Sequence, residues 1–151
     1  MEFKKILFPT DFSEGSVPAL SVLADLAKKF DAKIYIVHII YDIASATGWY
    51  VPHSSMDDMY RDLETSSKNE IERVGVEELR GYNNIVRMVV KGIPDDEIIR
   101  IANEEKIDLI VMGTHGRKGL DRILFGSTAS EVVRHAPCPV LTVRVPEHKT
   151  R

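Results

Sequence analysis

The sequence predicts a single-domain α/β protein with an open, mainly parallel five-stranded sheet and helices on both faces. Short apolar runs rich in β-branched residues alternate with segments whose apolar residues recur every three or four positions. The runs are apolar at nearly every position, as in parallel strands covered on both faces. A length of 151 residues suits one domain, 1–151, with one core. Right-handed crossovers complete a Rossmann-like prediction with strand order 3-2-1-4-5.

The first three elements follow directly from local patterns. An apolar run that ends in Pro-Thr-Asp predicts the first strand at residues 5–8. The first helix is predicted at 16–30, where Pro18 falls in the first turn, a position that tolerates proline. A β-branched and aromatic run predicts the second strand at 33–40.

The segment that follows the second strand has two parts. Residues 41–56 show no period and contain Gly48, Pro52 and several serines. A long connection inside a compact domain is usually functional or mobile, so we interpret 41–56 as a long loop and lid candidate. Residues 56–80 have sparse apolar positions at helical spacing, which predicts a half-exposed surface helix.

The second half repeats the alternation. The third strand is predicted at 85–90, and the next helix at 92–105, with proline early and acidic residues at the positive end of the helix dipole. A fourth apolar strand is predicted at 107–112. A short helix at 127–135 and a fifth strand at 139–143 complete the domain.

Composition excludes several classes of function. A formal net charge of −3 gives no field that would attract the whole protein to nucleic acid or to an anionic membrane. The single cysteine, Cys138, lies in an apolar stretch, and we interpret it as a buried structural thiol in a reducing compartment. The first residues resemble neither a signal peptide nor a membrane span, so we expect a cytoplasmic protein.

Two segments fall at the carboxyl edge of the predicted sheet, where open α/β sheets bind ligands. One is Pro9-Thr10-Asp11, and the other is the glycine-containing stretch 113–127. Glycines let backbone amides approach an anion, and the start of the 127–135 helix favours phosphate. Arg117, Lys118 and Arg122 add local positive charge.

A purely structural interpretation of this stretch stays open. The glycines serve strand ends and turns equally well, and Ser127 or Thr128 suits a helix N-cap, with Glu131 completing a capping box after Thr128. The chain lacks both the P-loop pattern and G-x-G-x-x-G, which excludes P-loop NTPases and typical dinucleotide binders.

The whole chain resembles the universal stress protein family. Gly113-x-x-Gly116, nine further residues and Gly126-Ser127 match the family's ATP-binding pattern, G-x2-G-x9-G-S/T, without a departure. Further resemblances are Ile-Leu-Phe-Pro-Thr-Asp-Phe-Ser at 6–13, His38-Ile39, Gly-Ile-Pro at 92–94 and Met-Gly-Thr-His-Gly at 112–116. These motifs span both halves of the chain in order.

The resemblance implies a nucleotide site that binds ATP, with Mg²⁺ or Mn²⁺ held through the phosphates. The residues that it implies for the adenosine part are Pro9, Thr10, Asp11, Ile39, Met112 and Gly113. The residues that it implies for the phosphates are Gly116, Gly126, Ser127 and Thr128, with His115 and Arg117 in the same loop. Asp11 is alternatively an acidic residue that initiates the following helix, and we interpret His38 as a core histidine.

The sequence offers no catalytic residue. No serine, cysteine or lysine has a recognisable nucleophile setting, and His53, His135 and His148 lack partners at metal-ligand spacing. A basic loop and a metal ion still leave slow phosphoryl transfer open. His115 suits phosphate binding, acid–base chemistry or a solvent-facing turn equally well.

The resemblance also implies a homodimer in which strand 140–143, at an edge of the sheet, pairs with its symmetry mate. Three functions remain open. The first is an ATP-binding regulatory module of the stress response that an unknown protein partner reads. The second is a slow ATPase or nucleotidyl-transferring enzyme, and the third is an interaction dimer that binds AMP or a signalling nucleotide.

Overall fold

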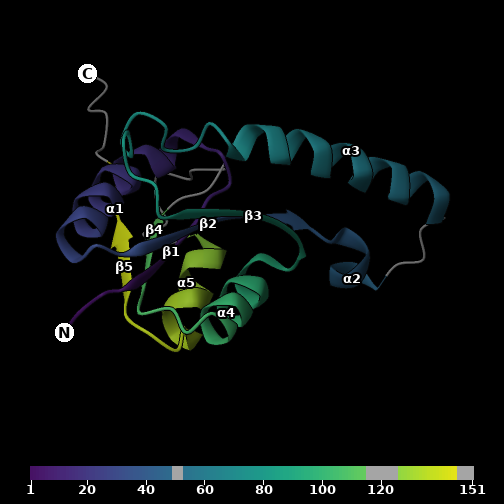
Figure 1. Ribbon diagram of the computed structural model, residues 1–151. Helices are drawn as coiled ribbons and strands as arrows, with labels where there is room; N and C mark the ends of the chain where they lie inside the picture. Colours follow the sequence, from purple (N-terminus) through teal and green to yellow (C-terminus); the bar gives the residue numbers. More distant parts are fainter. Residues whose placement is uncertain (49–52, 115–125, 146–151) are drawn as a thin grey trace, which may run out of the picture.

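The computed structural model describes residues 1–48, 53–114 and 126–145 (Figure 1). Its single five-stranded sheet has the order β3-β2-β1-β4-β5, and every pair of neighbours is parallel. The strands are β1 (Lys5–Pro9), β2 (Lys33–Tyr41), β3 (Ile85–Gly92), β4 (Leu109–Gly113) and β5 (Val140–Val143). The predicted fold class and strand order are therefore confirmed, and the order reverses between β1 and β4.

Helices form a layer on each face of the sheet (Figure 1). On one face lie α1 (Val17–Phe30) and α3 (His53–Ile71), and on the other α4 (Pro94–Glu104) and α5 (Ser127–His135). A 3-10 turn, η1 (Glu14–Ser16), precedes α1, and the short helix α2 (Ile43–Thr47) follows β2. The bounds predicted for the strands and for α1, α4 and α5 lie within two residues of the observed ones.

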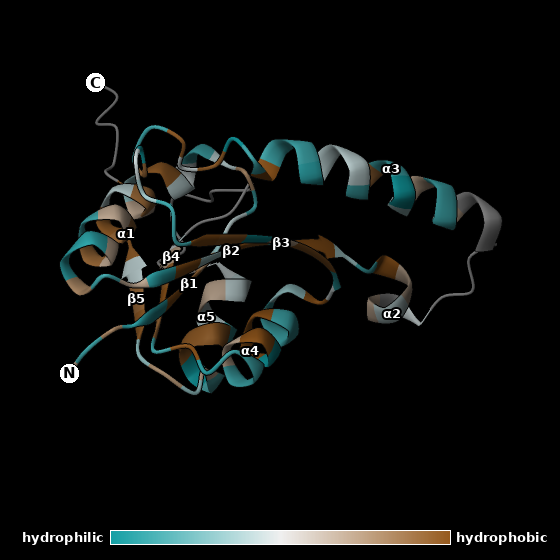
Figure 2. Ribbon diagram, in the orientation of Figure 1, coloured by the Kyte–Doolittle hydropathy of each residue, from teal (hydrophilic) through white to brown (hydrophobic). Residues whose placement is uncertain are grey.

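Two hydrophobic cores hold the layers together. The core under α1 includes Phe8, Leu23 and Ile36, and the core over α4 and α5 includes Ile110 and Val132; all five side chains are fully buried. Burying each such side chain contributes roughly 1.5–3 kcal/mol. Figure 2 shows the corresponding pattern, with hydrophobic strands in the middle and hydrophilic outer helix faces. Cys138 packs at the edge of the second core and is half-buried rather than buried, and this burial raises the pKa of its thiol.

The expectation of a long aperiodic loop at 41–56 is wrong in part, because α2 lies within it and α3 begins at His53. Asp42 caps α2: its carboxylate accepts hydrogen bonds from the Ser45 N–H at 3.2 Å and the Ser45 hydroxyl at 2.7 Å. These bonds hold the pKa of Asp42 below its usual value. Gly48 ends the helix in a left-handed conformation (φ 64°). A helix of five residues is too short to show a period in the sequence.

The helix predicted at 56–80 ends at Ile71, and turns replace its last part. Arg87 of β3 donates from Nε to the Ile71 carbonyl and from Nη2 to the Val74 carbonyl, both at 3.0 Å. A cation at these orphan carbonyls stabilises the helix end. Gly75, at φ 72°, then turns the chain away. The half-exposed character of α3 is confirmed, since Tyr60 is buried while Leu63 is 42% exposed.

Tyr82 fastens the segment before β3 to the end of α1. Its hydroxyl donates to the carbonyls of Ala27, at 3.1 Å, and Ala32. We expect Tyr82→Phe to lower the free energy of unfolding by about 1–2 kcal/mol in urea denaturation, because the buried carbonyls lose a donor.

Burial also raises the pKa of Tyr82 above its ordinary value of 10.0. Its contribution is therefore complete below pH 10 and lost as the pH rises through the folded-state pKa. Urea denaturation across this range should show less alkaline destabilisation in Tyr82→Phe than in the wild type. Equal losses in both proteins would contradict this role for the hydroxyl.

Among residues 1–48, 53–114 and 126–145, no helix is both long enough and apolar enough to cross a membrane.

Candidate functional site

The carboxyl end of β1 lies between those of β2 and β4, where the strand order reverses. Pro9 ends β1 and is buried. Thr10 is 7% exposed, and its N–H donates to the Val37 carbonyl of β2 at 2.9 Å. This is the position at which open α/β sheets bind ligands, so the loop after β1 borders the expected site.

Side-chain hydrogen bonds fix the loop after β1. The Phe12 N–H donates to Thr10 Oγ1 at 3.0 Å, and the Ser13 N–H donates to Asp11 Oδ1 at 2.9 Å. Phe12 has φ 66°, a left-handed conformation that costs a non-glycine residue energy. Asp11 therefore stabilises the turn that precedes η1, whereas the N-cap of η1 is Ser13.

His38 braces the same loop from β2. Its Nδ1 lies 2.8 Å from the Thr10 carbonyl oxygen, so this nitrogen carries a proton and donates. Its ring stacks on Phe12 with centroids 4.1 Å apart and planes 23° from parallel. This agrees with a structural role for the half-buried His38, although its work is to hold a loop rather than to fill a core.

The end of β4 is joined to the start of α5. Thr114, which is 5% exposed, donates its N–H to the Val143 carbonyl at 3.2 Å, and its own carbonyl accepts the Gly126 N–H at 2.7 Å. Gly126 is the N-cap, and among the described residues no side chain caps the helix. The interpretation of Ser127 or Thr128 as N-cap is therefore wrong, because both are helical. The amides of the first turn have no partners within the helix, which suits an anion.

An apolar wall flanks β1 on both sides. Ile39 of β2 is half-buried and Met112 of β4 is 6% exposed, and both pack with the core over α4 and α5. Gly113, the last residue of β4, lies in register with Val143 of β5. Apolar walls with a few convergent polar groups are typical of small-molecule sites.

The structure thus brings most of the predicted site residues to one edge of the sheet. These are Pro9, Thr10, Asp11, Ile39, Met112, Gly113, Gly126, Ser127 and Thr128. His115, Gly116 and Arg117 lie outside the described residues.

Sequence reasoning missed two residues of the site. The first is Phe12, whose left-handed backbone has no sequence signal. The second is Thr114, whose carbonyl accepts the hydrogen bond that joins the end of β4 to the start of α5.

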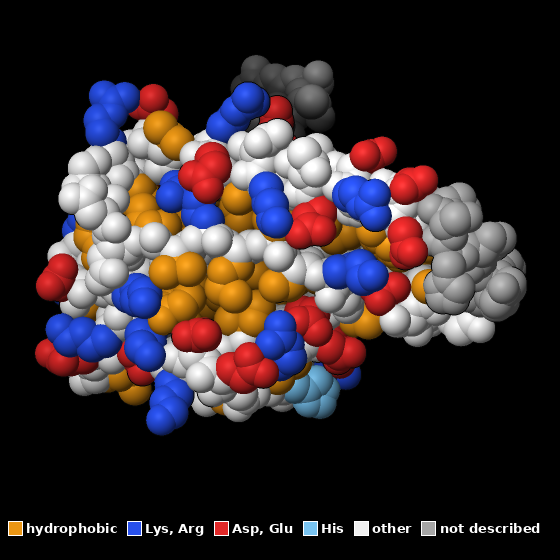
Figure 3. All heavy atoms as spheres, turned by 45° about the vertical axis from the view of Figure 1, so that its right-hand side comes forward, with side chains coloured by type: hydrophobic (Ala, Val, Ile, Leu, Met, Phe, Trp, Pro, Cys, Tyr) orange, Lys and Arg blue, Asp and Glu red, His pale blue; other side chains and the backbone are white. Residues whose placement is uncertain are grey.

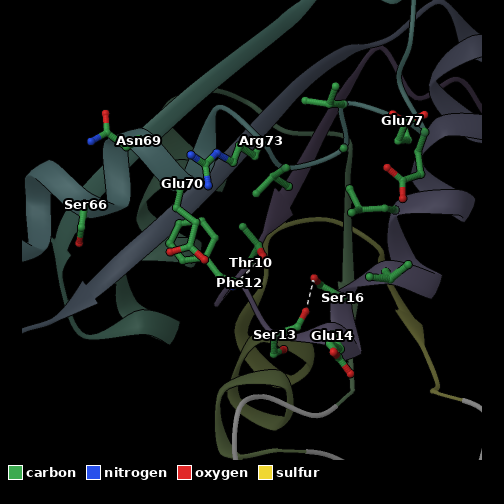
Figure 4. Close-up of a pocket in the computed structure, with 16 residues that line it drawn as sticks. Thr10, Phe12, Ser13, Glu14, Ser16, Ser66, Asn69, Glu70, Arg73 and Glu77 are labelled. Carbon is green, nitrogen blue, oxygen red and sulfur yellow. Dashed lines mark hydrogen bonds between the residues drawn. The ribbon is translucent and has the colours of Figure 1, made fainter.

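A groove of about 620 Å³ opens on the other side of the β1 loop, between α1 and the end of α3 (Figure 4). Phe12 and Ser13 line it from the loop, and Asn69, Glu70 and Arg73 line it from α3 and the turn that follows. The Ser13 hydroxyl oxygen is buried and has no hydrogen-bond partner among the described residues. The sequence gives no signal for this groove, because its two walls, residues 10–20 and 66–78, come from distant parts of the chain.

Metal-binding clusters were sought among His, Cys, Asp and Glu side chains. Within the part of the chain that the structure describes, no group of three or more could hold a metal ion. Protein side chains there do not build a dedicated metal centre.

Known proteins resemble this chain over nearly its whole length. A family model described as "Universal stress protein family" matches residues 2–144. Universal stress protein MJ0531 of Methanocaldococcus jannaschii is 35% identical, covering 96% of this chain and 84% of its own length. MJ0577 of the same organism is 33% identical over 94% of this chain and 95% of its own.

Solved structures agree with these matches. The structure of MJ0577 superposes with a TM-score of 0.86, at 30% identity in the structural alignment, covering 97% of this chain and 99% of that one. A universal stress protein in complex with cAMP has a TM-score of 0.60 at 23% identity, covering 95% of this chain and 98% of its own. The likeness at this identity concerns the fold alone.

Proposed function

The chain belongs to the universal stress protein family, and from this premise we propose that it is an ATP-binding regulatory protein whose nucleotide state a partner protein reads. The observation that carries the proposal is the meeting of three elements at the point where the strand order reverses. These elements are the hydrogen-bonded loop after β1, the apolar wall of Ile39 and Met112, and the start of α5, where the N-cap is Gly126.

Each element suits one part of the nucleotide. The backbone amides at the start of α5 suit phosphate oxygens. Gly126 has no side chain that would keep a phosphate away from these amides. Ile39 and Met112 suit the face of a base, and the Asp11 carboxylate suits ribose hydroxyls. A universal stress protein has been solved in complex with cAMP, so cAMP is included among the nucleotides to be tested.

A divalent cation fits this site only together with the phosphates. Within the described ranges no cluster of side chains could hold a metal ion, so Mg²⁺ or Mn²⁺ would be held largely by phosphates and water. The Ser127 hydroxyl, exposed at the start of α5, is the side chain best placed to add a ligand. The ion would neutralise phosphate charge.

The proposal includes a cytoplasmic homodimer joined through β5. In the described part of the chain, β5 pairs only with β4, and Leu141 is 38% exposed. An open edge of this kind pairs readily with a symmetry mate. Sedimentation should give the mass of a dimer for the wild type and of a monomer for Leu141→Glu. A monomeric wild type at micromolar concentration rules this dimer out.

The test of the nucleotide uses freshly purified protein without added ligand. Mass spectrometry of the small molecules that denaturation releases identifies a bound nucleotide, and calorimetric titrations compare ATP, AMP and cAMP. ATP bound tightly without turnover supports a regulatory protein. Turnover that is lost in His115→Ala or Arg117→Ala identifies a slow enzyme instead, and no binding of any adenine nucleotide refutes the proposal.

Asp11 offers a sharper test, because its structural and binding roles separate. Asp11→Asn keeps an oxygen that accepts the Ser13 N–H, whereas Asp11→Ala removes it. We expect Asp11→Ala to weaken ATP binding by about 10- to 100-fold, the value of a hydrogen bond to a charged group, and Asp11→Asn to weaken it less. Glu14→Ala, an exposed acid in η1, is the matched control for loss of charge. Unchanged affinity in Asp11→Ala would exclude a contact with the nucleotide.

A further inference from the structure

The edge of the sheet opposite β5 is formed by β3. This strand has eight residues, and each of them is paired with a residue of β2. The pairing runs from Ile85 opposite Ile34 to Gly92 opposite Tyr41. In the described residues no strand pairs with its other side. A long, regular edge without proline or a bulge leaves a row of backbone donors and acceptors available.

The side chains of this edge form an apolar surface. Val86, Met88 and Val90 point to the face of α4, where they pack at the margin of the second core and stay half-exposed. At the end of the strand, the neighbouring Tyr41 and Ile43 are 49% and 44% exposed. Figure 3 shows a broad hydrophobic area in the middle of one face of the molecule, ringed by charged side chains. Such patches mark interaction sites.

The charged residues of β3 leave most of this edge open to pairing with another strand. Charged side chains usually prevent edge strands from pairing. Arg87, however, is turned onto the other face, where it binds the carbonyls at the end of α3. The Lys91 ammonium lies 4.4 Å from the centre of the Tyr60 ring of α3, and Lys91 remains exposed. The charge of Lys91 already acts on the Asp42 and Glu64 carboxylates, so an acidic partner residue would share this exposed cation with them.

The same edge is adjacent to the proposed nucleotide site. Val90 lies in register with Ile39, the proposed base wall, and both pack with Met112 in the second core. We expect a ligand bound against this wall to affect the packing of the strand next to it. This part of the argument rests on the proposed function, whereas the open edge does not.

We propose that β3 binds an extended segment of a partner protein as an additional strand of the sheet. The segment has about eight residues, the length of β3, with apolar side chains at every second position against Val86, Met88 and Val90 and an acidic side chain opposite Lys91. Backbone hydrogen bonds provide affinity, and the alternating side chains provide specificity.

A second copy of this chain fits the edge less well. Suppose that β3 paired antiparallel with the β3 of another copy, with Met88 opposite Met88. Lys91 would then lie opposite Ile85 rather than opposite an acidic residue. Copies joined at β3 as well as at β5 would also extend the sheet without closing it, which leads to filaments. A peptide strand, in contrast, ends the sheet and covers its edge.

The experiment is a selection of random eight-residue peptides on the full-length protein, followed by titration of a synthetic copy of the enriched sequence. We expect alternating apolar residues with one Asp or Glu, and protection of the amides of 85–91 in hydrogen exchange when the peptide binds. Met88→Glu should weaken binding at least about tenfold, because it buries a charge against apolar side chains. Val76→Glu, at a 51% exposed valine in the turns after α3, should leave binding unchanged.

If Met88→Glu fails to fold, Lys91→Glu still tests the proposal. This variant should bind the acidic peptide more weakly, and it should prefer a peptide in which Lys replaces the acidic residue. An absent enrichment, or protection at the groove between α1 and α3 instead of β3, would overturn the proposal. A change of oligomeric mass in Met88→Glu would identify a second copy as the occupant.

ATP is titrated separately, so that failure of the nucleotide proposal and failure of the β3 proposal are distinguishable. Saturating ATP should change the affinity for the peptide several-fold, and the peptide should change the affinity for ATP by the same factor. ATP that binds without this change would refute the coupling between the two sites.

Discussion

The double variant Gly116→Val, Gly126→Val should lose at least about 100-fold in ATP affinity, or about 2.7 kcal/mol. Gly126 is the N-cap of α5, and its N–H is held by the Thr114 carbonyl, so a branched side chain added there stands beside the first-turn amides. A phosphate that these amides bind would be pushed away. Isothermal titration of ATP into wild type and variant measures the effect.

The control must show that α5 still forms. Arg134→Val places the same branched residue in the last turn of α5, at an exposed position, and should leave ATP affinity unchanged. Circular dichroism and the urea midpoint verify the fold of each variant. A folded double variant with wild-type affinity would mean that the glycines serve turns, as the structural interpretation of the sequence held.

Ile110→Ala should lower the free energy of unfolding by about 2–5 kcal/mol. Ile110 is fully buried in the second core, and it is in register with Leu7 of β1 and Val140 of β5. A cavity at this point weakens the packing of three neighbouring strands. For a chain of this length the melting temperature should fall by roughly 5–15 °C, as calorimetry or thermal denaturation would show.

Val133→Ala is the matched control, since it also shortens a branched apolar residue. Val133 is 49% exposed on α5, so its loss should cost less than about 1 kcal/mol. Ile110→Ala should retain ATP binding at temperatures where it is folded. A similar loss of stability in both variants would show that Val133 is covered in solution.

The order of the elements was readable from the sequence because each buried strand is a continuous apolar run. The run at 34–40 is the clearest case, since both of its faces are covered, and β2 forms there. The end of α3 was not readable. The chain turns at Ile71 because Arg87, sixteen residues later, takes its carbonyl, and a local pattern does not report so distant a donor.

The candidate site was predictable in position but not in construction. Parallel strands bring Asp11, Ile39 and Met112 to one edge, and glycine spacing indicates the start of α5. The brace of His38 on Thr10 and Phe12 depends on a left-handed residue that no local rule predicts. Likewise, the groove beside Ser13 exists only because the turns after α3 lie over the start of α1.

Because the Gly126 N–H is hydrogen-bonded to the Thr114 carbonyl, we expect the protein to accept other sequences between these two residues. Both ends of that segment are anchored to the sheet and to α5, so its replacement leaves the helix start in position. A library of inserts of different length and sequence at 115–125 would thus vary what the protein binds at this edge without redesigning the scaffold.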